Sequence, residues 1–160
     1  MIVTLDGDCQ NDPADIQKFV DEYHRTKTAL NSQKTCCLVI GHRLLRRDTG
    51  WRKFSSYTAK IARRSLLGDD TPDSGCGLKA FSRETFMTLP RFNHMHRFLP
   101  TLIKQRGGEV VSMAVNHRER LSGNSHYGTL DRLFVGLDDL MGVLWLGRRA
   151  IPPNTISEDY

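Results

Sequence analysis

The opening of the chain alternates between short apolar runs and one amphipathic stretch. Residues 2–5 (IVTL) are aliphatic or β-branched and stop at an acidic cluster, which predicts a buried strand. Asp12 and Pro13 follow as the expected N-cap and first residue of a helix. The apolar positions of that helix recur at helical spacing: Ile16, Phe19, Val20 and Tyr23. Residues 36–40 (CCLVI) predict a second strand that ends at Gly41. Strand, helix and strand in this order form the unit from which parallel sheets are built.

The rest of the chain continues the alternation of apolar segments and polar connections. The predicted elements, in order, are a helix over about 52–67, a loop over 69–77, a strand over 78–81, a helix over 98–105, a strand over 109–116, a loop over 118–128 and a helix over 130–149. Together they predict an α/β fold with a mixed, mostly parallel sheet flanked by helices. We expect one folded domain over 1–150, followed by a polar tail over 151–160.

Composition narrows the class of protein without identifying a ligand. Of the 160 residues, 39% are hydrophobic and 26% are charged, which is typical of a soluble globular protein. The formal net charge of +5 suits a phosphate-bearing ligand, a nucleic acid or an anionic membrane surface. The four cysteines have no paired C-x-x-C spacing, so we expect a reduced, cytoplasmic protein without a zinc finger or a disulfide framework. The longest apolar stretch, residues 133–146, contains two aspartates and is too short to span a bilayer.

Two carboxylates follow the first predicted strand. Asp6 and Asp8 are two residues apart, and Gln10 adds an amide oxygen. Ligands of open α/β sheets bind at the carboxyl ends of strands, and these oxygen donors suit Mg²⁺ or Mn²⁺ bridging a diphosphate. The alternative is a polar turn after the strand, with Asp12 acting only as a helix cap. The strand before the motif and the helix start after it favour the metal site.

A basic stretch extends from residue 43 to residue 64. Arg43, Arg52 and Ser56 suit a phosphate, because arginine binds phosphate oxygens through two N–H groups and serine adds one donor. Arg52 and Ser56 are one helical turn apart and therefore share a face of the predicted helix. For the other arginines of the stretch we prefer a solvated basic face that pairs with nearby acids: Arg46, Arg47, Arg63 and Arg64.

Five segments follow, in order, the motifs of one known family. They are residues 4–13 (TLDGDCQNDP), similar to D-x-D-x-Q-x-x-P; residues 41–43 (GHR), similar to G-x-R; Arg52 with Ser56, similar to R-x-x-x-S; residues 73–81 (DSGCGLKAF), similar to D-x-G-x-x-x-x-x-F; and residues 118–128 (RERLSGNSHYG), similar to R-x-x-G-x-S-K-Y-G. The chain thus resembles the dolichyl-phosphate mannose synthase-like, or polyprenyl-phosphate, glycosyltransferases of GT-A family 2. The likeness covers nearly the whole chain, and the order of the motifs makes it specific.

The resemblance implies an inverting transferase that moves a sugar from a nucleoside-diphosphate sugar, GDP-mannose or a UDP-sugar, to a polyprenyl or dolichyl phosphate. The implied site residues are the ligands of Mg²⁺ or Mn²⁺, Asp6, Asp8 and Gln10; the acceptor-phosphate ligands, Arg43, Arg52 and Ser56; the donor-diphosphate ligands, Arg120, Ser125 and His126; and the catalytic residue, Asp73. Asp73 would orient the acceptor or act as a base; the alternative is that it caps a Ser-Gly turn.

Two features depart from the family's pattern. His126 stands where many relatives have lysine, so a titratable group replaces a permanent positive charge. The family's first strands and helices, which hold the nucleotide, have no counterpart in the sequence. We therefore expect the chain to be the carboxyl-terminal portion of a GT-A domain, with little transferase activity of its own.

The helix predicted over 130–149 has a broad apolar face and basic residues near its ends. A core helix has the same pattern. A helix lying on a membrane surface beside a lipid acceptor fits the basic ends and Trp145 better. We therefore expect a cytoplasmic protein that is peripheral to the inner face of the membrane and does not bind nucleic acid.

The sequence leaves two other functions open. A haloacid dehalogenase-type phosphohydrolase would use Asp6 as nucleophile, Asp8 as acid, and Asp69 with Asp73 as its second acidic motif. That family has Thr or Val at the position of Gln10, and the spacing to the second motif is short. A nucleic-acid-binding domain would use the basic stretch, which lacks interleaved aromatic residues. His94 and His96 have a spacing that can bind zinc, but no third ligand follows, so we expect surface or acceptor-groove histidines.

Overall fold

A computed structural model of the protein describes residues 1–30, 36–43, 60–115 and 129–149, with side chains in the last range from residue 135 onward. Its helices and strands, in chain order, are β1 (Ile2–Thr4), α1 (Asp15–Ala29), β2 (Cys37–Arg43), β3 (Lys79–Phe81), α3 (Arg83–Thr88), the 3₁₀ turn η1 (Met95–Arg97), α4 (Leu99–Gln105), β4 (Glu109–Val115) and α5 (Thr129–Arg149). Residues 60–67 are also helical. This arrangement confirms the predicted α/β class with a mixed sheet.

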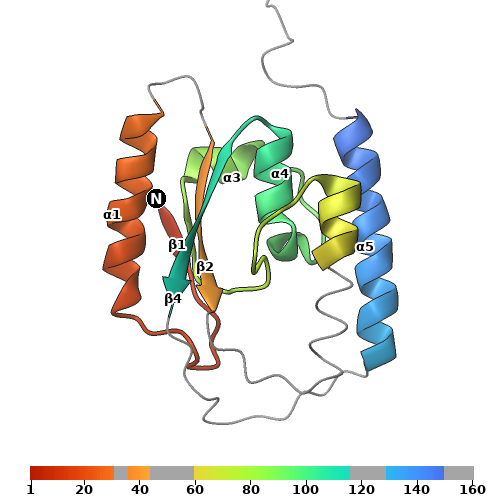
Figure 1. Ribbon diagram of the computed structural model, residues 1–160, viewed down its shortest axis with the longest axis horizontal. Coiled ribbons are helices and arrows are strands. Elements are labelled where there is room, and N and C mark those ends of the chain that lie inside the picture. Colours follow the sequence, from red (N-terminus) through yellow and green to blue (C-terminus); the bar gives the residue numbers. More distant parts are fainter. Residues whose placement is uncertain (31–35, 44–59, 116–128, 150–160) are drawn as a thin grey trace, which may run out of the picture.

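The strands of the described residues form one 4-stranded sheet in the order β1-β3-β2-β4. β3 is antiparallel to both of its neighbours, with Lys79 opposite Thr4 on one side and opposite Ile40 on the other. β2 and β4 are parallel, and their ladder ends at the pair Arg43–Val115. β1, β2 and β4 therefore run in one direction, so their carboxyl ends meet at one edge of the sheet, the lower edge in Figure 1.

Helices cover both faces of the sheet. α1 lies on one side, and α4 and α5 lie on the other (Figure 1). β2 is the centre of the core, and Leu38, Val39 and Ile40 have no exposed surface. From α1, the predicted apolar positions Phe19 and Tyr23 are buried. The helices on the opposite side bury a larger set: Leu99, Leu102, Ile103, Leu140 and Val143.

The opening strand–helix–strand unit differs from a simple parallel pair. β1 and β2 run in the same direction, but β3 lies between them and pairs with both. A short apolar run predicts that a strand exists, whereas its neighbour in the sheet is decided by tertiary packing. The antiparallel insertion was therefore not visible in the local pattern.

Two predicted boundaries were wrong. α1 begins at Asp15 because Asp12 Oδ1 accepts the N–H of Ala14 at 3.1 Å, which forms a turn before the helix instead of capping it. β2 continues through Gly41 to Arg43, since the Gly41 N–H donates to the Leu78 carbonyl at 2.9 Å and the parallel ladder persists.

The later elements are predicted better. α4, β4 and α5 match the predicted ranges 98–105, 109–116 and 130–149 within one residue at each end. The short elements α3 and η1 were not predicted. The predicted helical residues 52–59, the loop over 118–128 and the tail over 151–160 lie outside the described residues.

Cys37 sets an alkaline limit on the stability of the fold. Burial, assisted by the carboxylate of Glu109 opposite it in the ladder, raises the pKa of Cys37 from 9.0 to about 11. A thiol whose pKa is higher in the folded state stabilises the fold below its unfolded pKa, and that contribution is lost as the pH rises. Between pH 9.0 and about 11 we expect the free energy of unfolding to fall by roughly 2–3 kcal/mol because of this group.

Denaturant unfolding across that pH range measures the effect. Cys37→Ala should remove most of the decline, because no thiol then titrates inside the core. Cys9→Ala is the control, since the Cys9 thiol is exposed. An equal decline in Cys37→Ala and in the unmodified chain would contradict the assignment.

Candidate functional site

Residues 6–10, here called the acidic segment, come directly after β1, at the carboxyl edge of the sheet (Figure 1). Asp6 is exposed and Asp8 is half-buried, and Asp8 Oδ1 accepts the backbone N–H of Gln10 at 3.2 Å. Cys9, between Asp8 and Gln10, has a φ of 59°, a left-handed conformation that costs a non-glycine residue roughly 1–2 kcal/mol. Such strain persists only where the surroundings hold the backbone, which is common at ligand-binding sites.

The oxygen donors of this segment fit a hard divalent cation. Carboxylate and amide oxygens are the ligands that Mg²⁺ and Mn²⁺ prefer. Within the described residues, no group of three or more His, Cys, Asp or Glu is gathered closely enough to hold a metal ion. A cation held by Asp6, Asp8 and Gln10 would take its other ligands from water and phosphate, as Mg²⁺ commonly does.

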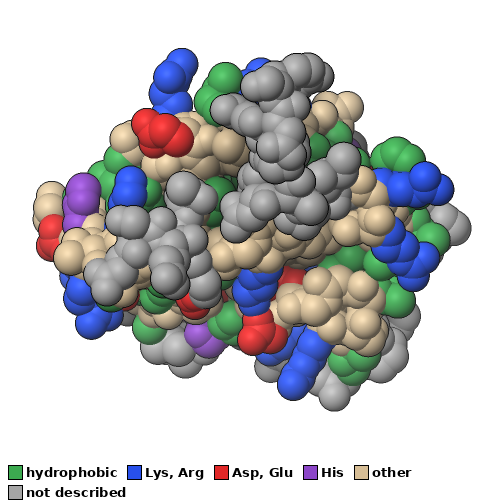
Figure 2. All heavy atoms as spheres, turned by 90° about the horizontal axis from the view of Figure 1, so that it is seen from above, with side chains coloured by type: hydrophobic (Ala, Val, Ile, Leu, Met, Phe, Trp, Pro, Cys, Tyr) green, Lys and Arg blue, Asp and Glu red, His purple; other side chains and the backbone are tan. Residues whose placement is uncertain are grey.

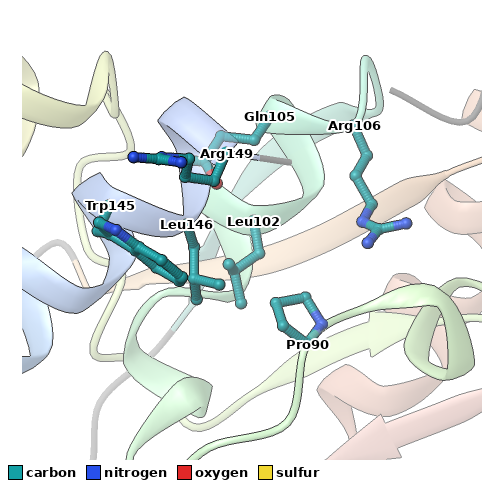
Figure 3. Close-up of a pocket in the computed structure, with 7 residues that line it drawn as sticks. All are labelled: Pro90, Leu102, Gln105, Arg106, Trp145, Leu146 and Arg149. Carbon is teal, nitrogen blue, oxygen red and sulfur yellow. The ribbon is translucent and has the colours of Figure 1, made fainter. Parts of the chain in front are cut away.

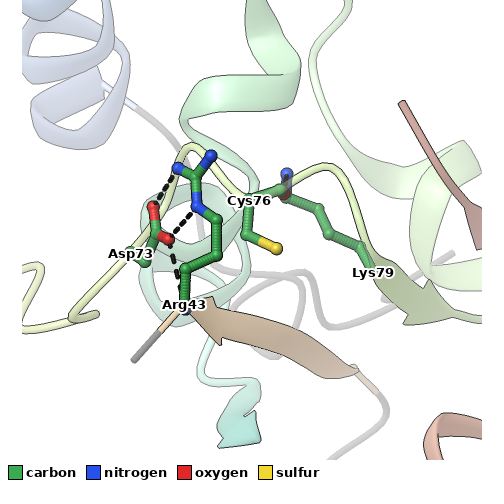
Figure 4. A network of polar contacts seen from close by, with 4 residues as sticks. All are labelled: Arg43, Asp73, Cys76 and Lys79. Atoms are coloured by element: carbon green, nitrogen blue, oxygen red, sulfur yellow. Dashed lines mark hydrogen bonds and ion pairs between the residues drawn. The ribbon is translucent and has the colours of Figure 1, made fainter. Parts of the chain in front are cut away.

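Arg43 and Asp73 form a bidentate ion pair beside the carboxyl end of β2 (Figure 4). Arg43 Nε donates to Asp73 Oδ2 at 2.6 Å, and Arg43 Nη2 donates to Oδ1 at 2.8 Å. The side chains are only 15% and 6% exposed, and hydrogen bonding to Asp73 raises the pKa of Arg43. A guanidinium has five N–H donors. The pair therefore fixes the plane of the guanidinium and leaves it further donors for an anion.

Lys79 belongs to the same cluster, and sequence analysis missed it. It begins β3, is 3% exposed, and donates from its ammonium to the carbonyl oxygen of Cys76 (Figure 4). Burial lowers the pKa of Lys79, while the charges of Asp6 and Asp73 act in the opposite direction. A strand of three residues is too short to show from its sequence whether its lysine is buried or exposed. Only the neighbouring motif could have drawn attention to it.

His96 of η1 and His94, which precedes η1, are both exposed, as the sequence predicted. His94 Nδ1 lies 3.2 Å from Asp139 Oδ2 of α5. Burial and the nearby cations Arg97 and Lys79 lower the pKa of His96, while the charge of Asp6 raises it.

The structure also bears on the basic stretch and on the second acidic motif. Arg64 is exposed, as expected of a solvated basic face. Arg63 is half-buried, so it is not fully solvated; burial lowers its pKa, while the charges of the nearby acids Asp69 and Asp73 raise it. Asp69 is buried and accepts from the Thr71 N–H at 3.0 Å and the Thr101 hydroxyl at 3.1 Å. With Asp69 and Asp73 engaged in this way, the second acidic motif of a phosphohydrolase gains no support. Five predicted site residues lie outside the described residues: Arg52, Ser56, Arg120, Ser125 and His126. Arg46 and Arg47, which were assigned to the solvated basic face, lie outside them as well.

α5 divides its apolar residues between the core and the surface. Leu140 and Val143 are buried, whereas Leu137, Met141 and Trp145 are exposed along one stripe at four-residue spacing. Beside Trp145, a shallow pocket of about 300 Å³ lies between α4 and α5 (Figure 3), lined by Pro90, Leu102, Gln105, Arg106, Trp145, Leu146 and Arg149. Within the described part of the chain, no helix has the length and apolar character required to cross a membrane.

Basic side chains are dispersed on the face that Figure 2 shows. There the Lys and Arg residues of the described part of the chain stand among apolar, acidic and uncharged ones, without forming one continuous patch. A nucleic-acid backbone requires a basic stripe or patch. This face therefore lends no support to the nucleic-acid alternative.

Known proteins match nearly the whole chain. It is 33% identical over 157 residues to dodecaprenyl-phosphate galacturonate synthase of Rhizobium johnstonii, a match that covers 96% of this chain and 44% of that protein. It is 28% identical over 130 residues to an undecaprenyl-phosphate 4-deoxy-4-formamido-L-arabinose transferase of Pectobacterium atrosepticum, covering 81% of this chain and 37% of that protein. A transferase of the same name from Pseudomonas paraeruginosa is 26% identical over 138 residues, 86% of this chain and 38% of that protein.

The chain thus spans less than half the length of these relatives. No family model and no solved structure matches it. The named relatives are polyprenyl-phosphate sugar synthases and transferases. The chain is therefore homologous to polyprenyl-phosphate glycosyltransferases of family 2, the family whose motifs its sequence resembles.

Proposed function

We propose that the full-length enzyme, meaning a protein of its relatives' length that contains this chain, transfers a sugar with inversion from a nucleoside-diphosphate sugar to a polyprenyl phosphate. The observation that carries the proposal is that the acidic segment and the Arg43–Asp73 pair share one edge of the sheet. Oxygen donors for a cation and an oriented guanidinium thus lie at the same edge, as a reaction requires that brings a donor diphosphate and an acceptor phosphate to one sugar carbon. The donor that we propose is GDP-mannose or a UDP-sugar.

On the donor side, Asp6, Asp8 and Gln10 are the proposed ligands of Mg²⁺ or Mn²⁺. When bound, the cation supplies positive charge to the departing nucleoside diphosphate. We propose that the loop predicted over 118–128 neutralises the remaining negative charge of the diphosphate, through Arg120, Ser125 and His126. His126 contributes a charge only when protonated, so this part of the site depends on pH.

On the acceptor side, Arg43, Arg52 and Ser56 are the proposed ligands of the lipid phosphate. A phosphate monoester has a second pKa near ~6, so at neutral pH the attacking oxygen needs little help from a base. Catalysis then consists of positioning and electrostatic stabilisation. We therefore propose that Asp73 acts as a positioning residue that aims Arg43, because both of its carboxylate oxygens accept from that guanidinium.

The exposed stripe of α5 supports a place for the protein at a membrane surface. Leu137, Met141 and Trp145 present apolar surface, and Arg148 and Arg149 follow at the end of the helix. An apolar stripe next to arginines is the pattern of helices that lie on anionic lipid. We propose that the enzyme is peripheral to the inner face of the membrane, where a lipid-borne phosphate is presented.

Arg52→Lys tests the acceptor site in the full-length enzyme. Lysine keeps the charge but cannot form the two parallel hydrogen bonds of a guanidinium, so we expect a higher KM for the lipid phosphate or a lower kcat. Ser56→Ala should have a smaller effect, because it removes one neutral donor. Hydrolysis of the donor without lipid should change little in either variant.

Paired assays of lipid glycosylation and donor hydrolysis measure both reactions in each variant. Arg64→Lys is the matched control, since Arg64 is exposed on the same basic stretch. If glycosylation and hydrolysis fall together in Arg52→Lys, the residue maintains the fold or the donor site, and the acceptor assignment is wrong.

A further inference from the structure

The acidic segment is attached to the turn that precedes β3. Thr4, the last residue of β1, donates from its hydroxyl to the carbonyl oxygen of Gly77 at 2.8 Å. Thr4 is also opposite Lys79 in the antiparallel ladder. The backbone from residue 77 to residue 79 therefore lies alongside the point where the chain leaves β1 and enters the acidic segment.

The Asp6 carboxyl group occupies the space that a side chain at position 77 would need. A Cβ built on Gly77 would lie 2.2 Å from Asp6 Cγ, and 2.3 Å and 2.4 Å from its two carboxylate oxygens. The described glycines with positive φ are Gly68 and Gly107, so Gly77 is not required for its backbone conformation. Glycine at position 77 therefore leaves room for the Asp6 carboxyl group, which a side chain there would displace.

Lys79, two residues after Gly77, adds a buried positive charge near this turn. Its ammonium is anchored on the Cys76 carbonyl and is almost completely withdrawn from solvent. A buried ammonium is costly unless an opposite charge lies nearby, and the charge of Asp6 stabilises the protonated lysine. The bare Cα of Gly77 thus leaves room for the Asp6 carboxylate, and the charge of Lys79 attracts it.

We propose that Gly77 is a positioning residue whose missing side chain seats the Asp6 carboxylate for cation binding. The inference rests on the proposed function of Asp6 as a metal ligand. It adds that the metal site is built by the turn before β3 as well as by the acidic segment. A side chain at position 77 should displace the flexible Asp6 carboxylate, so it should weaken metal binding more than it lowers the stability of the fold.

Gly75 offers a matched control in the same turn. A Cβ on Gly75 would lie 3.7 Å from both Arg43 Nη2 and Asp73 Oδ1, which is ordinary van der Waals contact. Gly75→Ala and Gly77→Ala therefore add the same methyl group two residues apart. They differ in whether Asp6 must move.

The test uses the 160-residue chain with Mn²⁺ and GDP as probes. Mn²⁺ affinity is read by electron paramagnetic resonance, the position of Asp6 by its carboxyl ¹³C resonance without metal, and stability by thermal unfolding. We expect Gly77→Ala to shift the Asp6 resonance and to weaken Mn²⁺ binding at least about tenfold. Gly75→Ala should change neither.

A double variant separates the seat from a general packing defect. Asp6→Ala removes the carboxyl group, so adding Gly77→Ala to it should weaken Mn²⁺ binding no further. If Gly77→Ala alone lowers the Tm, Asp6→Ala should restore it, because the space is then vacant. Additive losses in the double variant, or an unshifted Asp6 resonance in Gly77→Ala, would overturn the inference.

The same measurements distinguish failure of the inference from failure of the proposed metal site. If Asp6→Ala and Asp8→Asn both leave Mn²⁺ affinity unchanged, the metal ligands were assigned wrongly. If those two variants weaken binding and Gly77→Ala does not, only the role of Gly77 is wrong.

Discussion

Asp73→Asn is expected to lower the free energy of unfolding by about 3–5 kcal/mol. Asp73 and Arg43 are 6% and 15% exposed at their side chains and share two hydrogen bonds of 2.6 and 2.8 Å. Asparagine keeps the shape of the side chain but removes its charge, which leaves the guanidinium without its counter-ion in a desolvated place. Urea unfolding of the 160-residue chain measures the loss.

Two further variants show whether burial is the cause. Arg25→Ala breaks the Glu22–Arg25 pair, in which the arginine side chain is 78% exposed, and should change stability little. Arg43→Met combined with Asp73→Leu leaves no charge unpaired and should recover part of the loss. A cost in Asp73→Asn as small as that in Arg25→Ala would contradict the structural role of the pair.

The same substitution separates a positioning role from a base in the full-length enzyme. If Asp73 aims Arg43, Asp73→Asn should raise the KM for the lipid phosphate and leave the pH dependence of kcat unchanged. If Asp73 were a base, the acidic limb of the kcat profile should disappear instead. The pH profile therefore decides between the two roles.

Asp8→Asn is expected to weaken Mn²⁺-dependent binding of nucleoside diphosphate by the full-length enzyme, on the order of a hundredfold. Asn Oδ1 can still accept the Gln10 N–H that Asp8 accepts at 3.2 Å, so the turn should persist while a charged ligand is lost. Calorimetric titration with GDP or UDP, with and without Mn²⁺, measures the change.

Asp21→Asn is the matched control for that experiment. Asp21 is an exposed carboxylate of α1 that accepts a hydrogen bond from the Gln17 side chain at 2.9 Å. The two substitutions make the same chemical change, and we expect only the one in the acidic segment to affect the metal. Metal dependence retained in full by Asp8→Asn would count decisively against the site.

Sequence patterns were sufficient to locate α1, whose apolar residues recur over several helical turns, and α4, which ends at a glycine with a positive φ. The apolar spacing that includes Phe19 and Tyr23 predicted α1, and the turn at Gly107, with a φ of 71°, ends α4 where expected. Six residues, the length of α3, are too few to establish a period. The position of β3 depends on which strand it pairs with, and local composition does not contain that information.

The candidate site was predicted in its residue types more than in its contacts. The D-x-D motif and the resemblance located the acidic segment, Arg43 and Asp73. That Arg43 and Asp73 bind each other, 30 residues apart, follows only from the fold. Lys79 and Gly77 were missed for the same reason, since a buried cation and a close approach are properties of the packed structure.

The position of β3 between β1 and β2 has a consequence for the rigidity of the site. Its three residues pair with β1 on one side and with β2 on the other. The acidic segment after β1 and the arginine at the end of β2 are thus linked through one short strand, without a ladder of their own. β3 lies inside the sheet and its three residues are buried, so it belongs to the part of the fold that opens least readily. In the proposed reaction, β3 then acts as a rigid spacer that keeps the cation ligands and the guanidinium at a fixed separation.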